Sequence, residues 1–213
     1  MFGEAQMHVL APAEYVTDEV NEEEADTRYN RIHEQCGVIK FGDGENWILI
    51  PGDADHVAFK EHIMYHEDKG NLGAFVLAAS HHGSRSFFMA NDGDEPYLDA
   101  LQAIAPSYVV VSAPTQEESK HDHPHDEAME LYEDQVGQEN VLHSGQERLT
   151  YIFDIYTDGM ISDAQDDGGK LAEDYGLTDN DDGGDDNLGG PYTKGPFVLT
   201  GSRTGDLAPR KFG

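Results

Sequence analysis

WILIPGDAD, residues 47–55, and FVLAASHHGSRS, residues 75–86, decide the fold, because each places an apolar run directly before a polar cluster. Short apolar runs bounded by Gly and Pro are typical of buried strands. The segment between them, residues 56–66, is helix-competent, and Asp55 is a candidate N-cap for it. A strand, a helix and a second strand in succession predict α/β layering.

The flanking sequence continues this alternation. Gly42-Asp43-Gly44-Glu45 has the composition of a hairpin turn, so the strands on either side of it should pair antiparallel. The regular alternation in residues 149–156 favours an edge-type strand. The predicted strands are residues 35–41, 46–52, 74–79, 108–112, 141–142 and 149–156, and the predicted helices are residues 56–66, 97–104 and 126–132.

The charge of the chain excludes several function classes. Its 213 residues include 43 Asp and Glu against 13 Lys and Arg, which gives a net charge of −30. Direct nucleic-acid binding and a basic membrane-surface role both need clustered Lys and Arg, so the composition argues against them. An acidic folded body is typical of adaptation to high salt, which indicates a halophilic protein.

Cysteine usage and hydropathy indicate the compartment. Cys36 is the single cysteine, so no intrachain disulfide can form, and cytoplasm is the expected location. The longest apolar runs are strand-sized, and residues 1–15 lack the charged and apolar regions of a signal peptide. The sequence therefore predicts a chain without a membrane span.

The sequence divides into a body, residues 1–156, and an acidic Gly- and Asp-rich tail, residues 157–213. Such a composition offers little apolar surface to offset the conformational entropy lost on ordering, so we expect a flexible tail. Residues 196–201 could add one strand to it. A calcium loop beginning at Asp179 is not expected, because Gly183 and Gly190 occupy ligand positions of the EF-hand pattern.

Three polar clusters follow predicted strands, and the carboxyl ends of parallel strands meet at one edge of a sheet. They are Gly52-Asp53, His81-His82-Gly83-Ser84, and the histidines His121, His123 and His125. A carboxylate with imidazoles suits Zn, Mn or Fe. Each cluster also has a purely structural interpretation: an Asx turn at Asp53, an N-cap at Ser84 with two surface histidines, and an adventitious patch of three histidines.

These motifs, together with LQAIAPSYVVVSAP and HPHDEAMELYED, resemble the second half of the metallo-β-lactamase fold, and especially the hydrolase domain of ComEC-type DNA-uptake proteins. The similarity covers residues 30–156. It implies an αββα sandwich, with a mixed sheet and flanking helices, of which this chain holds the carboxyl-terminal half. It also implies that Asp53 bridges two metal ions, Zn or Mn, that His81 or His82 completes the shell of one ion, and that His123 lies near the site.

The sequence departs from that family in two places. The first-half signature, His-x-His-x-Asp-His, does not occur in residues 1–52, and about 50 residues are too few for the strands and helices of a half-sandwich. The family's Asn-x-Tyr-Gly before His-Pro is replaced by residues 116–122, QEESKHD, which puts the family's substrate contacts in question.

Two functions therefore stay open. The first is a metal-dependent hydrolase, phosphodiesterase-like or acting on another small hydrolysable substrate, that is incomplete as a single chain and needs a complementary amino-terminal half or a homo-oligomer. In it the histidine not bound to metal, with Ser84 or His123, would orient substrate or protonate the leaving group. The second is a non-catalytic remnant that serves as a binding or regulatory module.

Overall fold

The computed structural model of the protein describes residues 5–43, 46–67, 69–147, 150–155, 161–166 and 197–200. The strands are β1 (Gln6–Ala11), β2 (Val38–Asp43), β3 (Asn46–Ile50), β4 (Val76–Ala78), β5 (Tyr108–Val111), β6 (Val141–His143), β7 (Thr150–Ile155), β8 (Ile161–Asp166) and β9 (Phe197–Thr200). The α-helices are α1 (Glu14–Glu22), α2 (Ala25–Asn30), α3 (Met64–His66), α4 (Asp99–Ile104), α5 (Asp126–Val136) and α6 (Ser144–Glu147). A π-helical segment, Ala58–Ile63, leads directly into α3.

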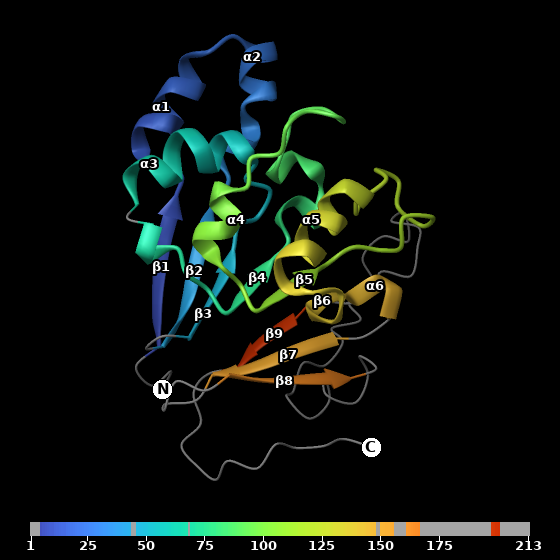
Figure 1. The fold of residues 1–213 in the computed structure, drawn as a ribbon. Helices are drawn as coiled ribbons and strands as arrows, with labels where there is room; N and C mark the ends of the chain where they lie inside the picture. The colour runs from blue at the N-terminus through green and yellow to red at the C-terminus, as the bar shows by residue number, and fades with distance from the viewer. Residues whose placement is uncertain are drawn as a thin grey trace, which may run out of the picture.

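A six-stranded mixed sheet organises the molecule, and its strand order, β1-β2-β3-β4-β5-β6, is the order of the sequence. The β1–β2 and β2–β3 pairs are antiparallel, and the pairs from β3 to β6 are parallel. Because each parallel strand is added on the same side as the one before, right-handed crossovers place every connecting helix on one face. Figure 1 shows α4 and α5 on that face of the sheet.

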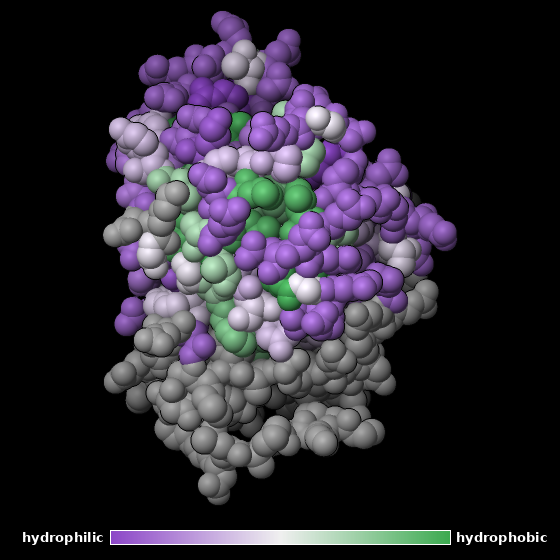
Figure 2. Space-filling view, viewed as in Figure 1, coloured by the Kyte–Doolittle hydropathy of each residue, from purple (hydrophilic) through white to green (hydrophobic). Residues whose placement is uncertain are grey.

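The main core lies between these helices and the sheet. Alternation along each strand directs Leu49, Leu77 and Val109 toward the helices, where they join one core cluster. Phe59, Phe87 and other fully buried side chains of the connecting segments fill the same cluster. Figure 2 shows hydrophobic residues gathered between α4 and α5, with hydrophilic side chains around them.

A second, three-stranded sheet, in the order β8-β7-β9, covers part of the opposite face. Tyr151 and Phe153 of β7 form a second core cluster with Ile48, Val76 and Val110, the residues that alternate with those of the main core. The layers are therefore helices, six-stranded sheet and three-stranded sheet (Figure 1).

Several expected elements are present. The hairpin strands pair antiparallel as β2 and β3. The backbone N–H of Ala58 donates to the Asp55 carboxylate at 2.9 Å, as an N-cap requires. The α/β class, the mixed sheet and its flanking helices are likewise confirmed.

One detail differs from expectation. β7 lies between β8 and β9, so the prediction of an edge strand is wrong: β7 exposes neither edge, although its residues alternate as in a strand with one buried face. β8 and β9 fall in the segment expected to be a tail, and β9 is the strand that residues 196–201 could add. Residues 167–196, including the Asp179 segment, and 201–213 lie outside the described residues.

Among the described helices, none combines the length and the apolar composition needed to cross a membrane.

Candidate functional site

Hydrogen bonds join the three loops that follow β3, β4 and β5. The backbone N–H of His81 donates to the carbonyl of Gly52 at 2.9 Å, and that of His125 donates to the carbonyl of Gly83 at 3.0 Å. The hydroxyl of Ser80, which is fully buried, donates to the carbonyl of Ala54 at 2.6 Å. The clusters that the sequence placed at one edge of the sheet therefore come together there.

The backbone turns at the histidine pair itself. His81 and His82 have φ angles of 47° and 57°, in the left-handed region, and Gly83 follows with φ 81°. A residue with a Cβ in this region costs about 1–2 kcal/mol, and such strain gathers at functional sites. The sequence allowed for a turn at Gly83; the structure begins it two residues earlier, which takes the two imidazoles out of the alternation of an extended strand.

The turn gives the two histidines different surroundings. The ring of His81 is half-buried, and its centroid lies 4.9 Å from that of His123. His82 is exposed, and its Nδ1 lies 2.7 Å from the carbonyl oxygen of Ser112, so Nδ1 carries the proton and donates. In a neutral His82 this arrangement leaves Nε2 unprotonated, which is how a backbone carbonyl commonly orients a metal-binding imidazole.

His81 is held neutral and has an unused nitrogen. Burial lowers its pKa, and Asp53, whose negative charge acts in the opposite direction, does not offset the effect of burial. Its Nδ1 is buried and has no hydrogen-bond partner. A buried nitrogen without a partner costs free energy, and a ligand at this position would remove that cost.

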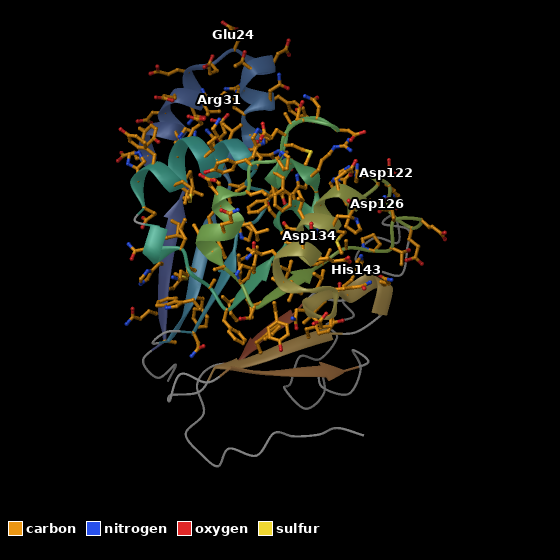
Figure 3. The ribbon with its side chains drawn as sticks, in the orientation of Figure 1. Glu24, Arg31, Asp122, Asp126, Asp134 and His143 are labelled. Atoms are coloured by element: carbon orange, nitrogen blue, oxygen red, sulfur yellow. The ribbon has the colours of Figure 1, made fainter. Side chains whose placement is uncertain are left out.

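The histidines of the third loop extend the same cluster. The His123 ring lies 4.8 Å from that of His125, whose Nδ1 accepts a hydrogen bond from the backbone N–H of Arg85 at 3.2 Å. His121 is exposed and lies at the margin, with its centroid 6.3 Å from that of His123. Figure 3 shows Asp122 on this loop and Asp126 at the start of α5, so in the sequence a carboxylate lies on each side of the His123–His125 pair.

The sequence reasoning missed His33. It lies on a short 3-10 turn, Ile32–Gln35, and its ring centroid is 4.7 Å from that of His81. Cys36 follows this turn; burial raises the pKa of its thiol, and the nearby backbone of Asp53 opposes that rise. No spacing rule connects His33 to residues about fifty positions later, so a motif search could not have found it.

Ser84 has the structural role that the sequence left open. Its hydroxyl accepts a hydrogen bond from the backbone N–H of Ser86 at 3.3 Å and caps the turn Arg85–Phe87. Its side chain is buried, which ties it to the loop scaffold.

The residues fit part of a metal shell. Imidazoles and a carboxylate suit a borderline divalent ion, and the unpartnered Nδ1 of His81 supports a ligand there. Within the described ranges, however, no three His, Cys, Asp or Glu side chains are arranged to hold one ion together. Asp53 with His81 or His82 could therefore supply one or two ligands, and the other ligands would have to come from elsewhere.

The half-buried histidines make the stability of the fold dependent on pH. Burial, with the neighbouring His81 and His125, lowers the pKa of His123 from 6.5 to about 4. Between these values the unfolded chain binds a proton that the folded chain does not, so the free energy of unfolding should fall as the pH drops from 6.5 toward 4. Urea unfolding at pH 7 and pH 5 measures this change. The free energy of unfolding should fall more for the wild type than for His123→Gln, because the carboxylates titrate alike in both proteins. An equal loss in the two proteins would contradict a neutral, half-buried His123 imidazole.

Comparison of the chain with protein-family models, with curated proteins and with solved structures gave no match.

Proposed function

We propose that residues 1–156 are the carboxyl-terminal half of a metal-dependent hydrolase with the metallo-β-lactamase fold, of the ComEC type. The observation that carries the proposal is the meeting of the Gly52-Asp53, His81-His82 and His123 loops at one edge of the parallel strands. The helix, sheet and sheet layers agree with three of the four layers of an αββα sandwich, although β8 and β9 of the second sheet lie beyond residue 156. The remaining ligands would be supplied by a complementary half or by a second copy of the chain.

The chain's own residues have distinct roles under this proposal. Asp53 and either His81 or His82 would hold a divalent ion, Zn or Mn, and the complete enzyme would hold two. Such an ion supplies hydroxide near neutral pH and polarises a phosphoryl or acyl oxygen. His123, whose pKa of about 4 keeps it neutral at pH 7, would orient the substrate by a hydrogen bond, since such a low pKa makes it a weak proton acceptor and a poor proton donor at that pH.

The charge limits the substrate. A net charge of −30 repels nucleic acid over a Debye length of about 8 Å at physiological ionic strength. A small phosphodiester or another small hydrolysable compound therefore fits better than a long polynucleotide, unless high salt screens the repulsion.

Metal binding tests the proposal directly. The untagged chain should bind Zn²⁺, and Asp53→Asn or His81→Gln should weaken the affinity at least about tenfold, since each removes one of very few ligands. His8→Gln is the matched control, because His8 is an exposed imidazole on β1. Competition with a chromophoric chelator measures the affinity. Equal affinities in all four proteins would mean that no ion binds at this edge.

Hydrolysis tests whether these residues make only part of a site. The chain by itself, with Zn²⁺ or Mn²⁺ added, should turn over bis(p-nitrophenyl) phosphate little faster than the buffer does. Robust turnover that Asp53→Asn abolishes would show a complete site and contradict the half-site proposal.

A second candidate is a non-catalytic module that keeps the half-fold for binding or regulation. One observation favours it: in the described part of the chain no group of three ligands is assembled. The two candidates differ in the Zn²⁺ titration, because a remnant without a metal role would lose nothing on Asp53→Asn.

A further inference from the structure

The turn Ile32–Gln35 presents two neighbouring side chains to different surroundings. His33 contacts His81 at the candidate site, with 4.7 Å between ring centroids. Glu34 is the one buried side chain of this turn, at 7% exposure, whereas Ile32 is 51% exposed. The turn is therefore fixed by a buried carboxylate, and not by the apolar side chain beside it.

Two side chains, Arg31 and His62, contact Glu34 directly, and Tyr15 extends the contacts from His62. Arg31 makes a two-pronged contact, with Nε donating to Oε1 at 3.0 Å and Nη2 donating to Oε2 at 2.8 Å. His62, from the π-helical segment, lies with Nε2 3.0 Å from the same Oε2. Tyr15 of α1 bridges His62 and His66, with its hydroxyl 2.9 Å from Nδ1 of His62 and 3.1 Å from Nε2 of His66. We call these five residues the Glu34 network.

The directions of these hydrogen bonds are determined by the chemistry of the groups. A carboxylate only accepts, so Nε2 of His62 donates to Glu34. In neutral His62 the Nδ1 then accepts from the Tyr15 hydroxyl, and Nε2 of His66 donates to the Tyr15 oxygen. Each of these hydrogen bonds then has one donor and one acceptor, so the contacts from His66 through Tyr15 and His62 to Glu34 are mutually consistent.

Glu34 is charged inside this network. Burial alone raises its pKa, but the hydrogen bonds from Arg31 and His62 outweigh burial and hold the pKa below its ordinary value. Arg31 also contacts Glu23 at 3.3 Å, which links the turn to the end of α1. Figure 3 shows Arg31 below α2, where the helices of the amino-terminal part meet the rest of the fold.

A buried ion pair is weak evidence for stability, because the cost of desolvation can equal the Coulomb gain. Its better-attested role is to specify one arrangement among several. Here the arrangement that the ion pair specifies includes His33, the residue next to Glu34. A short 3-10 turn that is fixed at Glu34 leaves the backbone of His33 little freedom.

We infer that His33 is a further imidazole of the candidate site and that Glu34 is its positioning residue, acting through the Glu34 network. The inference extends the proposed function by one site residue, but the placement of His33 does not depend on metal binding. The two are therefore tested separately.

Histidine ring resonances of the metal-free, full-length chain test the placement. Glu34→Gln keeps the size of the side chain and removes its charge, so it should shift the ring signals of His33 and His81 while leaving that of His8 in place. Glu61→Gln is the matched control, since Glu61 lies on the same segment as His62 but pairs at the surface with Lys60, at 3.4 Å. Unchanged His33 and His81 signals in Glu34→Gln would overturn the inference.

A second variant covers the case in which Glu34→Gln fails to fold. His62→Gln removes the two hydrogen bonds of the imidazole, to Glu34 and to Tyr15, and leaves the Arg31–Glu34 contact, so it should fold and move the His33 ring by a smaller amount. If the His33 signal stays in place although the His62 contact is lost, the network does not position His33.

Zn²⁺ affinity gives the separate readout. If the site binds metal, Glu34→Gln should lower the affinity about tenfold, the effect typical of losing a residue that orients a ligand. A shift of the His33 ring without any Zn²⁺ binding in the wild type would support the positioning role and count against the proposed function. Wild-type affinity in Glu34→Gln with a displaced His33 would show that His33 does not belong to the site.

Discussion

Replacing Phe87 by alanine should lower the free energy of unfolding by about 3–5 kcal/mol, the usual cost of removing a fully buried aromatic ring. Phe87 has no exposed surface and packs edge-on against Phe59, at 5.1 Å between centroids, and against Phe88, at 4.9 Å. Its ring also stacks with Tyr132 at 6.2 Å. Removal of the ring would leave a cavity between α5 and the segment that follows the histidine pair. Even if the neighbouring side chains moved partly into this cavity, many of the contacts of the Phe87 ring would be lost.

Urea unfolding monitored by far-ultraviolet circular dichroism measures this loss. Tyr65→Ala is the control, because Tyr65 is 80% exposed and its replacement should change stability by less than about 0.5 kcal/mol. A loss below about 1 kcal/mol for Phe87→Ala would mean that the aromatic cluster is not packed as described.

Replacing Gly83 by alanine should cost about 2–4 kcal/mol, because two penalties add. The first is the left-handed backbone, with φ 81°. The second is steric: a Cβ would meet the Cβ of Pro124 at 2.7 Å and Cγ1 of Val111 at 3.3 Å. Relief of this overlap requires the His81-His82 loop to move away from the His123 loop.

Gly93 provides a matched control for this substitution. It has the same φ of 81°, but a Cβ there would meet nothing within 4 Å, so Gly93→Ala carries the backbone penalty alone. The difference between the two variants measures the packing of the loops, and nuclear Overhauser contacts between the His81 and His123 rings report their separation. Equal losses of stability, with the ring contacts intact, would contradict the close approach at Gly83.

The features that the sequence predicts best depend either on residues close together in the chain or on a single strand–helix–strand crossover. The hairpin around residues 42–45 and the Asp55 cap depend on residues within a few positions of each other, and both are confirmed. The approach of the Gly52-Asp53 loop to His81 was predictable because one right-handed crossover places β3 and β4 side by side.

The features that the sequence did not predict depend on distant partners. The environment of β7 is set by β8 and β9, and alternation within β7 cannot show whether its edges are paired. His33 reaches the site because Glu34 is anchored by side chains from other segments, and a single buried carboxylate in a charge-rich sequence gives no signal of its burial. The left-handed turn at His81 is strained, and local propensity argues against such a turn.

The agreement between strand order and sequence order has a consequence for how the chain folds. Once β2 and β3 form their hairpin, each later strand from β4 to β6 can add at the exposed edge left by the strand before it, after closure of one connecting segment. No strand has to enter between two that are already paired. Each parallel pairing still joins residues about 30 positions apart, so every added strand carries the loop-closure cost that makes parallel sheets slow to form. The sheet can nevertheless assemble one strand at a time from its amino-terminal side while the rest of the polypeptide is still being synthesised.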